Sequence, residues 1–275
     1  MIARRTLTAS LVAACASLAA SAASAQTFGP RVGPSWESPQ HFALELRVGS
    51  FNQAIDEQLG LGTSGPYHQI FCSTRDSTAP AGSAVGCPMR FRVGLEFDWQ
   101  IVRLGPVGNL GIGAFAQYGN AFANAPATAG MTSTDPTQWR RTAQTTSLQA
   151  INTAIFGVFR LDVLARKVRW LPLAPYAKAG IALAPWWVTV GEQTARDPLT
   201  SQDAVGLSNG FFVGGGLSVM LDAFEPQAAR QWDQLSGVNH SYLFFELNYT
   251  YLGGFGRRTL DLGGIGWTAG VTLEL

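Results

Sequence analysis

Hydrophobic and polar residues alternate along eight segments of the chain. The clearest alternation runs through FRVGLEFDWQIVRL (91–104), where every second residue from Phe91 to Ile101 is apolar and Arg92, Gly94, Glu96, Asp98 and Gln100 lie between them. A period of two residues is typical of a β-strand with one apolar face. Similar alternation occupies residues 42–49, 110–118, 151–163, 177–187, 211–222, 243–251 and 265–275. The chain is therefore predicted to be all-β with eight strands.

The segments between these strands alternate in length. Long connections are expected at 52–88, 119–146 and 191–208, and a glycine-rich one carries Arg257 and Arg258. The intervening links are mostly shorter: residues 105–108, a link through Arg166 and Lys167, and residues 225–237, which are expected to contain a short helix. Long external loops alternating with short periplasmic links are typical of outer-membrane barrels. The pattern predicts an eight-stranded antiparallel up-and-down transmembrane β-barrel with long extracellular loops.

Aromatic residues are expected at both ends of this barrel. One belt is predicted at the outer ends of the strands and a second towards the periplasm, as at the two interfaces of a membrane. The outer set is Phe51, Phe91, Tyr118, Trp187, Phe211, Tyr249 and Tyr251, and the periplasmic set is Phe42, Trp99 and Phe159.

Composition supports this interpretation. The 275 residues are 47% hydrophobic and only 13% charged, with a net charge of +1, whereas soluble domains have about 25% charged residues. High hydrophobicity with little net charge excludes disorder. Past residue 25 no uncharged apolar run reaches the roughly 18 residues of a spanning helix. The net charge and scattered arginines do not favour a nucleic-acid partner. A soluble, secreted β-sandwich remains the alternative fold.

The N-terminus predicts export. Residues 1–25 read as a signal peptide, with the basic start MIARR, an apolar stretch and a cleavage site of the A-x-A type at Ala23–Ala25. Residues 26–40 are then a periplasmic segment and residues 41–275 the barrel. In an alternative interpretation, Val12–Cys15 resembles a lipoprotein signal with Cys15 as the lipidated residue.

Removal of the signal peptide leaves two cysteines, Cys72 and Cys87, in the first long loop. An even pair in an oxidising compartment predicts a disulfide, with two free thiols as the alternative. No further cysteine and no nearby histidine pair completes a metal site, so neither a metal nor a cofactor is predicted.

Charged residues on the polar faces of the strands are expected inside the barrel, since a charge facing lipid costs about 2–4 kcal/mol at the membrane midplane. The inward set contains four basic and five acidic residues, a near balance that predicts mutual pairing and a plugged lumen. The alternative is that these charges are solvated in a small water-filled lumen. The set is Glu45, Arg47, Arg92, Glu96, Asp98, Arg160, Asp162, Lys178 and Glu246.

The chain ends inside its last predicted strand. Thr268, Gly270, Leu273 and Leu275 resemble the C-terminal signal read by the outer-membrane assembly machinery, although Leu275 replaces the usual final Phe. The expected partners are therefore outer-membrane lipid and, during biogenesis, that machinery.

Catalysis is not predicted, and no catalytic residue is assigned. Of the three histidines, His41 begins the first predicted strand and His68 lies in the first long loop. His240 is adjacent to Ser241, but neighbours in a strand point to opposite faces. A lipid-modifying enzyme would need a histidine and an acid or hydroxyl to converge at one rim.

Several segments, including HFALELRVGSFNQAIDEQLG, PYHQIF and PYAKAGIALAPWWVTVG, resemble a family of predicted outer-membrane β-barrels from myxobacteria and related bacteria. The architecture is also similar to small barrels of the OmpA, OmpX and OmpW type. The resemblance implies the fold and a location in the Gram-negative outer membrane, without an established activity. We expect a monomer with a structural or surface-interaction role through its external loops. The alternative is a narrow channel for small hydrophobic or other small solutes, with a lateral opening near Pro185, because proline interrupts strand pairing.

Overall fold

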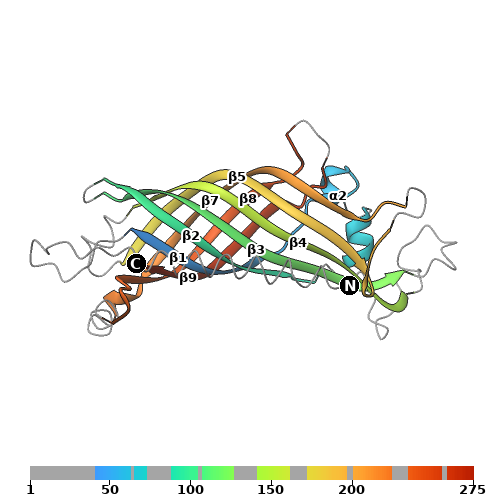
Figure 1. Ribbon diagram of the computed structural model, residues 1–275, viewed down its shortest axis with the longest axis horizontal. Helices are drawn as coiled ribbons and strands as arrows, with labels where there is room; N and C mark the ends of the chain where they lie inside the picture. Colours follow the sequence, from blue (N-terminus) through green and yellow to red (C-terminus); the bar gives the residue numbers. More distant parts are fainter. Residues whose placement is uncertain are drawn as a thin grey trace, which may run out of the picture. The chain divides into compact units, whose positions relative to one another are not determined.

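The computed structural model describes residues 41–62, 65–72, 88–104, 107–126, 141–161, 172–196, 201–224, 235–255 and 259–275. Eight long strands form a closed antiparallel ring in which neighbours along the chain pair with each other and the last strand pairs with the first (Figure 1). A two-residue strand, β6 (Gln193–Thr194), pairs only with the end of β5. The eight-stranded barrel predicted from the alternation is confirmed. The ring consists of β1 (Phe42–Ser50), β2 (Phe91–Arg103), β3 (Asn109–Pro126), β4 (Arg141–Arg160), β5 (Leu173–Val190), β7 (Val205–Met220), β8 (His240–Tyr251) and β9 (Gly264–Glu274).

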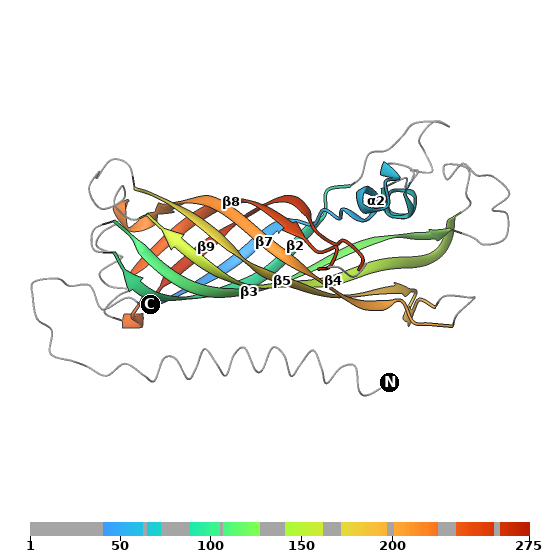
Figure 2. The same ribbon diagram turned by 90° about the horizontal axis from the view of Figure 1, so that it is seen from above.

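The two ends of the barrel differ in their connections. The C-terminus lies at the end where β2 meets β3, β4 meets β5 and β7 meets β8, which we call the turn end. The short helix α2 (Ile55–Gln58) lies at the other end, the loop end (Figure 2). The π-helical turn η2 (His68–Cys72) follows α2, and the 3-10 helix η4 (Leu221–Ala223) follows β7. No helix among these residues is long and apolar enough to cross a membrane.

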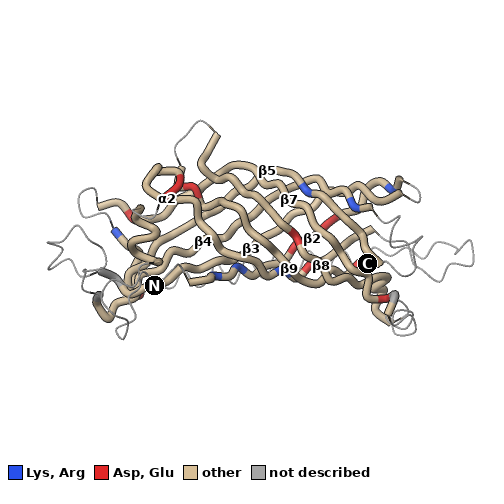
Figure 3. Tube along the Cα trace, turned by 180° about the vertical axis from the view of Figure 1, so that it is seen from behind, with Lys and Arg blue, Asp and Glu red and all other residues tan. Residues whose placement is uncertain are grey.

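The outer face of the ring is apolar on every strand. The outward positions are those that the alternation predicts, and most of the traced wall is free of charged residues (Figure 3). A closed ring leaves no unpaired backbone edge, and an apolar exterior is what a bilayer requires of it. The chain is therefore a transmembrane β-barrel. Exposed apolar side chains on the eight strands include Leu46, Leu95, Ile112, Ile155, Ile181, Val213, Leu247 and Ile265.

Glycines on the inner face make room for the large side chains. Arg47 on β1 lies directly across from Gly94 on β2 and Gly270 on β9, and Lys178 on β5 lies across from Gly214 on β7. A small eight-stranded barrel has an interior just wide enough for side chains. A bulky residue facing a glycine in the next strand is therefore how this interior accommodates charged groups.

Several strands are longer than the alternation indicates. The predicted loop 191–208 is wrong at its end, because β7 begins at Val205. The predicted loop 119–146 is wrong at both ends, because β3 continues to Pro126 and β4 begins at Arg141. The extension keeps the inside–outside alternation, with Phe122 exposed and Ala121 and Ala123 buried. Small and polar residues form ladder hydrogen bonds as readily as apolar ones, so the hydrophobic pattern ends before the pairing does.

Two other positions also differ from the prediction. Phe51, expected in the outer aromatic belt, is buried because β1 ends at Ser50 and the chain turns inwards there. Leu221 and Asp222, expected to continue the seventh segment, belong to η4 because β7 ends at Met220. The signal peptide (1–25), the segment 26–40 and most of the expected helix at 225–237 lie outside the described residues.

Candidate functional site

A network of charged side chains occupies the middle of the barrel interior. Its members come from strands around the ring and are almost completely withdrawn from solvent. Six belong to the inward set expected from the sequence, and Glu274 is added by the structure. The network consists of Glu45, Arg47, Glu96, Arg160, Lys178, Glu246 and Glu274.

Arg47 and Lys178 form the centre of this network. Arg47 donates from Nη2 to Oε1 of Glu246 at 2.6 Å and from Nη1 to Glu96. Lys178 donates from Nζ to Oε2 of Glu45 at 3.1 Å and also to Glu96. Each cation thus connects carboxylates from different strands. Buried charges are retained when they are paired and hydrogen-bonded, and both conditions hold here.

Arg160 extends the network towards the turn end. Its Nη1 lies 2.5 Å from Oε1 of Glu274, and its Nη2 lies 3.5 Å from Oε1 of Glu45. Gln100 and Tyr242 also donate to Glu274, at 3.0 and 3.2 Å. The alternation places Glu274 on the inner face, so the sequence was sufficient to include it among the interior charges. The predicted inward set omits it because its position next to the C-terminus was interpreted only in terms of the assembly signal.

Aromatic rings surround these charges. Phe115, Phe156 and Phe212 form a cluster with ring centroids 5.0 to 6.0 Å apart. The guanidinium of Arg47 lies 5.2 Å from the ring centre of Phe115, and Nζ of Lys178 lies 5.4 Å from that of Phe156. Cations over aromatic faces gain further stabilisation when they are desolvated. The cluster and the ion pairs together fill this part of the interior.

Two other residues of the predicted inward set, Arg92 and Asp98, are not joined to the network by ion pairs in the described part of the chain. Asp98 is 1% exposed, and neither of its carboxylate oxygens has a hydrogen-bond partner among the described residues. Arg92 is buried and donates to Oδ1 of Asn248 at 2.8 Å, and no described carboxylate lies within ion-pair distance of it. The expected pairing is therefore not seen for Arg92 and Asp98 among the described residues: Arg92 is bonded to a neutral amide, and the cations nearest Asp98 bond to other carboxylates. Asp162 lies outside the described residues.

Three interior carboxylates are close enough to hold a metal ion. Oxygens of Glu45, Glu96 and Asp98 lie within 4.8 Å of one another. Lys178, however, already contacts Glu45 and Glu96. The ammonium group thus supplies the positive charge that a metal ion would bring, and we assign no metal to these residues.

The segment that contains α2 and η2 covers the loop end of the barrel, and we call it the covering segment. Asp56 accepts hydrogen bonds from the backbone N–H groups of Tyr67 and His68, at 2.9 and 2.6 Å. Gln58 donates to the carbonyl oxygen of Thr259 at 2.7 Å and accepts from the N–H of Asp261 at 2.9 Å. The first two hydrogen bonds stabilise the covering segment internally, and the other two join it to the loop between β8 and β9. The covering segment's apolar side chains Phe51, Ile55 and Phe71 belong to one buried cluster with Leu148 of β4 and with Leu252 and Leu262 of the last loop.

Burial affects two ionisable groups of this covering segment. Burial raises the pKa of the Tyr67 hydroxyl above its usual value, and the nearby Arg90 only partly offsets this rise. Burial also lowers the pKa of the Arg90 guanidinium. Arg90 donates from Nη2 to the carbonyl oxygen of Phe71 at 2.7 Å and lies over the rings of Phe71 and Phe122. The segment is thus a packed structure.

His240 has an acidic partner that the sequence pattern did not reveal. Its Nδ1 lies 2.6 Å from Oδ2 of Asp222 in η4, and Ser241 donates from Oγ to Oδ1 of the same carboxylate at 3.0 Å. The imidazole and the hydroxyl thus share one carboxylate. A nucleophile and its base would need a hydrogen bond between the histidine and the serine, which this arrangement does not supply. The cluster anchors η4 to the start of β8.

The remaining predicted site residues lie near the two ends of the barrel. Cys72 is buried at the end of η2, and Cys87 lies outside the described residues. Thr268, Gly270 and Leu273 lie in β9, and Leu275 follows it and donates from its N–H to the carbonyl oxygen of Phe42 at 2.8 Å. The disulfide and the assembly signal both stay predictions.

Three solved structures are similar to the chain at low identity. Neisserial surface protein A has 14% identity and a TM-score of 0.41, covering 85% of this chain and 97% of that chain. Ail, the attachment invasion locus protein of Yersinia pestis, solved with the heparin analogue sucrose octasulfate, has 9% identity and a TM-score of 0.36, covering 87% and 99%. The outer membrane protein OprG from Pseudomonas aeruginosa has 9% identity and a TM-score of 0.44, covering 87% and 97%. No protein-family model and no curated protein matches the sequence.

The strand pairing and the apolar exterior of the chain itself establish its class. Irregular backbone and open sheet edges do not occur against lipid, and closed barrels of this type are outer-membrane structures. The chain is a protein of the Gram-negative outer membrane.

Proposed function

We propose that this outer-membrane β-barrel is a non-catalytic, monomeric protein with an occluded lumen. Its role is structural or one of surface interaction, through the connections at its loop end. The observation that carries the proposal is the filling of the interior at two levels. Ion pairs and phenylalanine rings fill the middle, and the segment containing α2 and η2 covers the loop end. An open channel would need a continuous passage through both levels.

Planar-bilayer recording tests occlusion directly. The purified full chain is expected to give no stable conductance. The matched control is a variant that lacks the rings of Phe115, Phe156 and Phe212. It removes the aromatic side chains from the middle of the barrel interior and keeps the charged residues. Stable single-channel conductance of porin size from the wild-type protein would overturn the proposal.

The proposed orientation sets the loop end outside the cell and the turn end in the periplasm. It is supported by the longer connections at the loop end, in keeping with the usual plan of outer-membrane barrels. Protease treatment of intact cells, followed by mass spectrometry, tests it. Cleavage confined to the segments 51–90 and 127–140 is expected, and cleavage confined to 161–172 contradicts the orientation.

The proposal includes the disulfide and the family. Cys72 is buried at the end of η2, and an even pair of cysteines in an oxidising compartment favours the Cys72–Cys87 disulfide. The resemblance to predicted outer-membrane barrels of myxobacteria carries no activity, and membership of that family remains part of the proposal.

A second candidate function is a narrow channel that opens sideways through the wall. One observation favours it: the β4–β5 ladder lacks the pairs between Ala150–Trp186 and Thr153–Leu183, and Pro185 lies in this gap. Proline has no N–H for the ladder, and two missing pairs span about 7 Å of strand. The pairing register is the same on both sides of the gap.

A disulfide across the gap tests this second candidate. The double variant Ile151→Cys/Pro185→Cys joins the two strands at that point, and uptake of small apolar solutes into proteoliposomes is compared before and after reduction. Uptake that appears only on reduction supports a lateral opening. Equal uptake in both states, matching empty liposomes, rejects it.

A further inference from the structure

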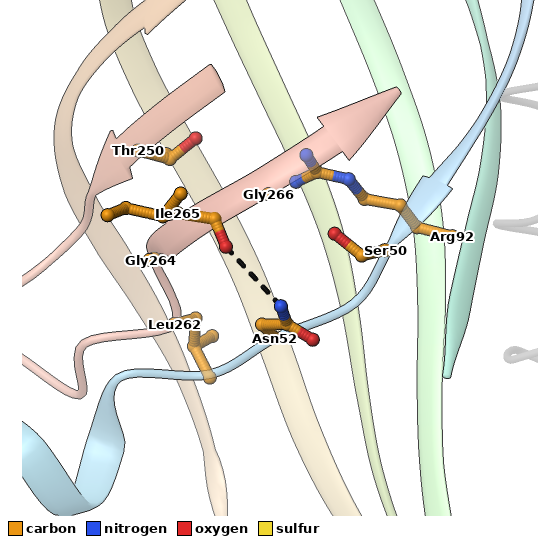
Figure 4. A pocket seen from close by; sticks show the side chains of 9 residues that line it. Ser50, Asn52, Arg92, Thr250, Leu262, Gly264, Ile265 and Gly266 are labelled. Carbon is orange, nitrogen blue, oxygen red and sulfur yellow. Dashed lines mark hydrogen bonds between the residues drawn. The ribbon is translucent and has the colours of Figure 1, made fainter. Parts of the chain in front are cut away.

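A pocket at the loop end of the barrel contains a buried cation that has no ion-pair partner among the described residues. Figure 4 shows Arg92 from β2, Ser50 at the end of β1, Asn52 beyond it and Thr250 from β8 around the stretch 262–266 that leads into β9. The pocket is partly open to solvent, and its cavity volume is about 10 Å³, room for about one water-sized group such as a single oxygen of an oxyanion. Its Arg92 is linked to Glu246 of the charged network through Asn248, and occupancy of the pocket does not require the lumen to conduct or to be closed.

The guanidinium of Arg92 is only partly satisfied by protein. The residue is 6% exposed, and Nη2 donates to Oδ1 of Asn248 at 2.8 Å. Among the described residues, Nε has no hydrogen-bond partner and no carboxylate lies within 4 Å of the guanidinium. Asn248 donates in turn to Glu246 at 3.4 Å, so the nearest link to a negative charge runs through a neutral amide. Burying a cation without an opposite charge is costly.

The other groups around the pocket are neutral and able to donate hydrogen bonds. Oγ of Ser50 accepts from the N–H of Trp267 at 3.1 Å, which leaves its own proton free to point elsewhere. Nδ2 of Asn52 uses one proton towards the carbonyl oxygen of Ile265 at 3.3 Å, and a second proton remains. Thr250 contributes another hydroxyl. None of the nine lining residues is acidic, so every charge at this pocket is positive.

Three glycines lie next to Arg92, and the one at position 266 leaves space between Ser50 and the guanidinium. Gly49 on β1 and Gly119 on β3 are the cross-strand neighbours of Arg92. A Cβ atom at Gly266 would lie 2.8 Å from Oγ of Ser50 and 3.6 Å from Nη2 of Arg92. A side chain at position 266 would therefore occupy the space where a ligand of the guanidinium would lie.

We propose that this pocket binds a small anion, such as a phosphate, sulfate or carboxylate group. The Arg92 guanidinium supplies the charge, and Ser50, Asn52 and Thr250 supply neutral donors. Arginine suits oxyanions because its planar fork donates parallel hydrogen bonds. A bound anion would contact β1, β2, β8 and the start of β9 together, and would so join the covering segment to the strand ends. The same chemistry fits a free anion or an anionic group on a larger molecule.

Nuclear magnetic resonance of the full chain in maltoside micelles tests the site, since this detergent contains no phosphate. The side-chain Nε–Hε signal of Arg92, assigned by its loss in Arg92→Gln, is followed while sodium phosphate replaces sodium chloride at constant ionic strength. A saturable shift of this signal is expected. The signal of Arg196, a solvent-exposed arginine paired with Asp203, is the internal control and is expected to stay unchanged.

Two further variants separate the site from general salt effects. Thr250→Val removes one donor and keeps Arg92, and is expected to weaken phosphate binding several-fold. Gly266→Ala fills the space and is expected to abolish the shift. Dihexanoyl phosphatidic acid in a second titration distinguishes a lipid phosphate from free phosphate. A wild-type signal that does not saturate, or equal saturation in Gly266→Ala, would overturn the proposal.

Discussion

Lys178 and Glu45 lie on opposite sides of the barrel and meet at its centre, with Nζ of Lys178 3.1 Å from Oε2 of Glu45. Lys178 is on β5 and Glu45 is on β1, separated in the ring by three strands in each direction. A contact of this kind holds the two walls at a fixed distance. It also means that the long side chain of Lys178 extends into the lumen at that level, as the proposed occlusion requires.

Removing the charge of Lys178 is expected to destabilise the barrel strongly. In Lys178→Met the volume is nearly conserved, but the carboxylates of Glu45 and Glu96 lose a cation in a buried site. Breaking a buried pair by removing one partner typically costs about 3–5 kcal/mol. The free energy of unfolding, measured by urea titration in phospholipid vesicles, checks this.

The control for this measurement is an exposed pair. Arg196 and Asp203 lie 2.8 Å apart with both side chains largely exposed. Surface pairs contribute about 0–1 kcal/mol, so Arg196→Met is expected to change little. Equal losses in both variants would contradict a stabilising role for the interior network.

A charge on the outer wall is expected to be unfavourable in a bilayer. Ile181 on β5 is 64% exposed and lies beside Ile155 of β4 on the outer face. An arginine near the midplane of the membrane costs about 2–4 kcal/mol, so Ile181→Arg should lower the free energy of unfolding in vesicles by that amount. Leu235, exposed outside the strands, provides the control Leu235→Arg, which should have little effect. A tolerated Ile181→Arg would show that this position does not face lipid.

Much of the barrel follows from the sequence because lipid and the lumen impose opposite requirements on adjacent residues. That contrast places Ile181 outside and Lys178 inside without further information. The same rule loses force beyond the membrane, which is why it misses the extension of β3 as far as Pro126 and the inward turn at Phe51.

The partners of the interior charges are less accessible to sequence reasoning. Alternation gives the inner face of each strand, but pairing depends on the level at which each side chain lies, which is set by strand register. Arg47 reaches Glu246 on β8, 199 positions away along the chain, while Asp98 lies buried without a hydrogen-bond partner among the described residues. A count of balanced charges cannot distinguish these two cases.

The disulfide prediction can be tested by mass. If Cys72 and Cys87 are joined, alkylation of the unfolded protein without reductant should modify neither, and reduction should expose both. The loop-closure estimate for a loop of this size is about 3 kcal/mol, so Cys72→Ser/Cys87→Ser should be less stable. Alkylation of both cysteines before reduction would show two free thiols instead.

Alkaline pH is expected to release the covering segment at the loop end. Burial raises the pKa of Tyr67 above its usual value, so folding favours the neutral hydroxyl. The resulting stability is complete below the pKa of an unfolded tyrosine, about 10, and is lost as the pH rises through the higher folded value. Proteolysis within the segment 51–72, measured against pH, should therefore increase at the alkaline end. Tyr67→Phe has no ionisable hydroxyl and should remove this increase. If both proteins show the same alkaline cleavage profile, ionisation of Tyr67 does not control the segment.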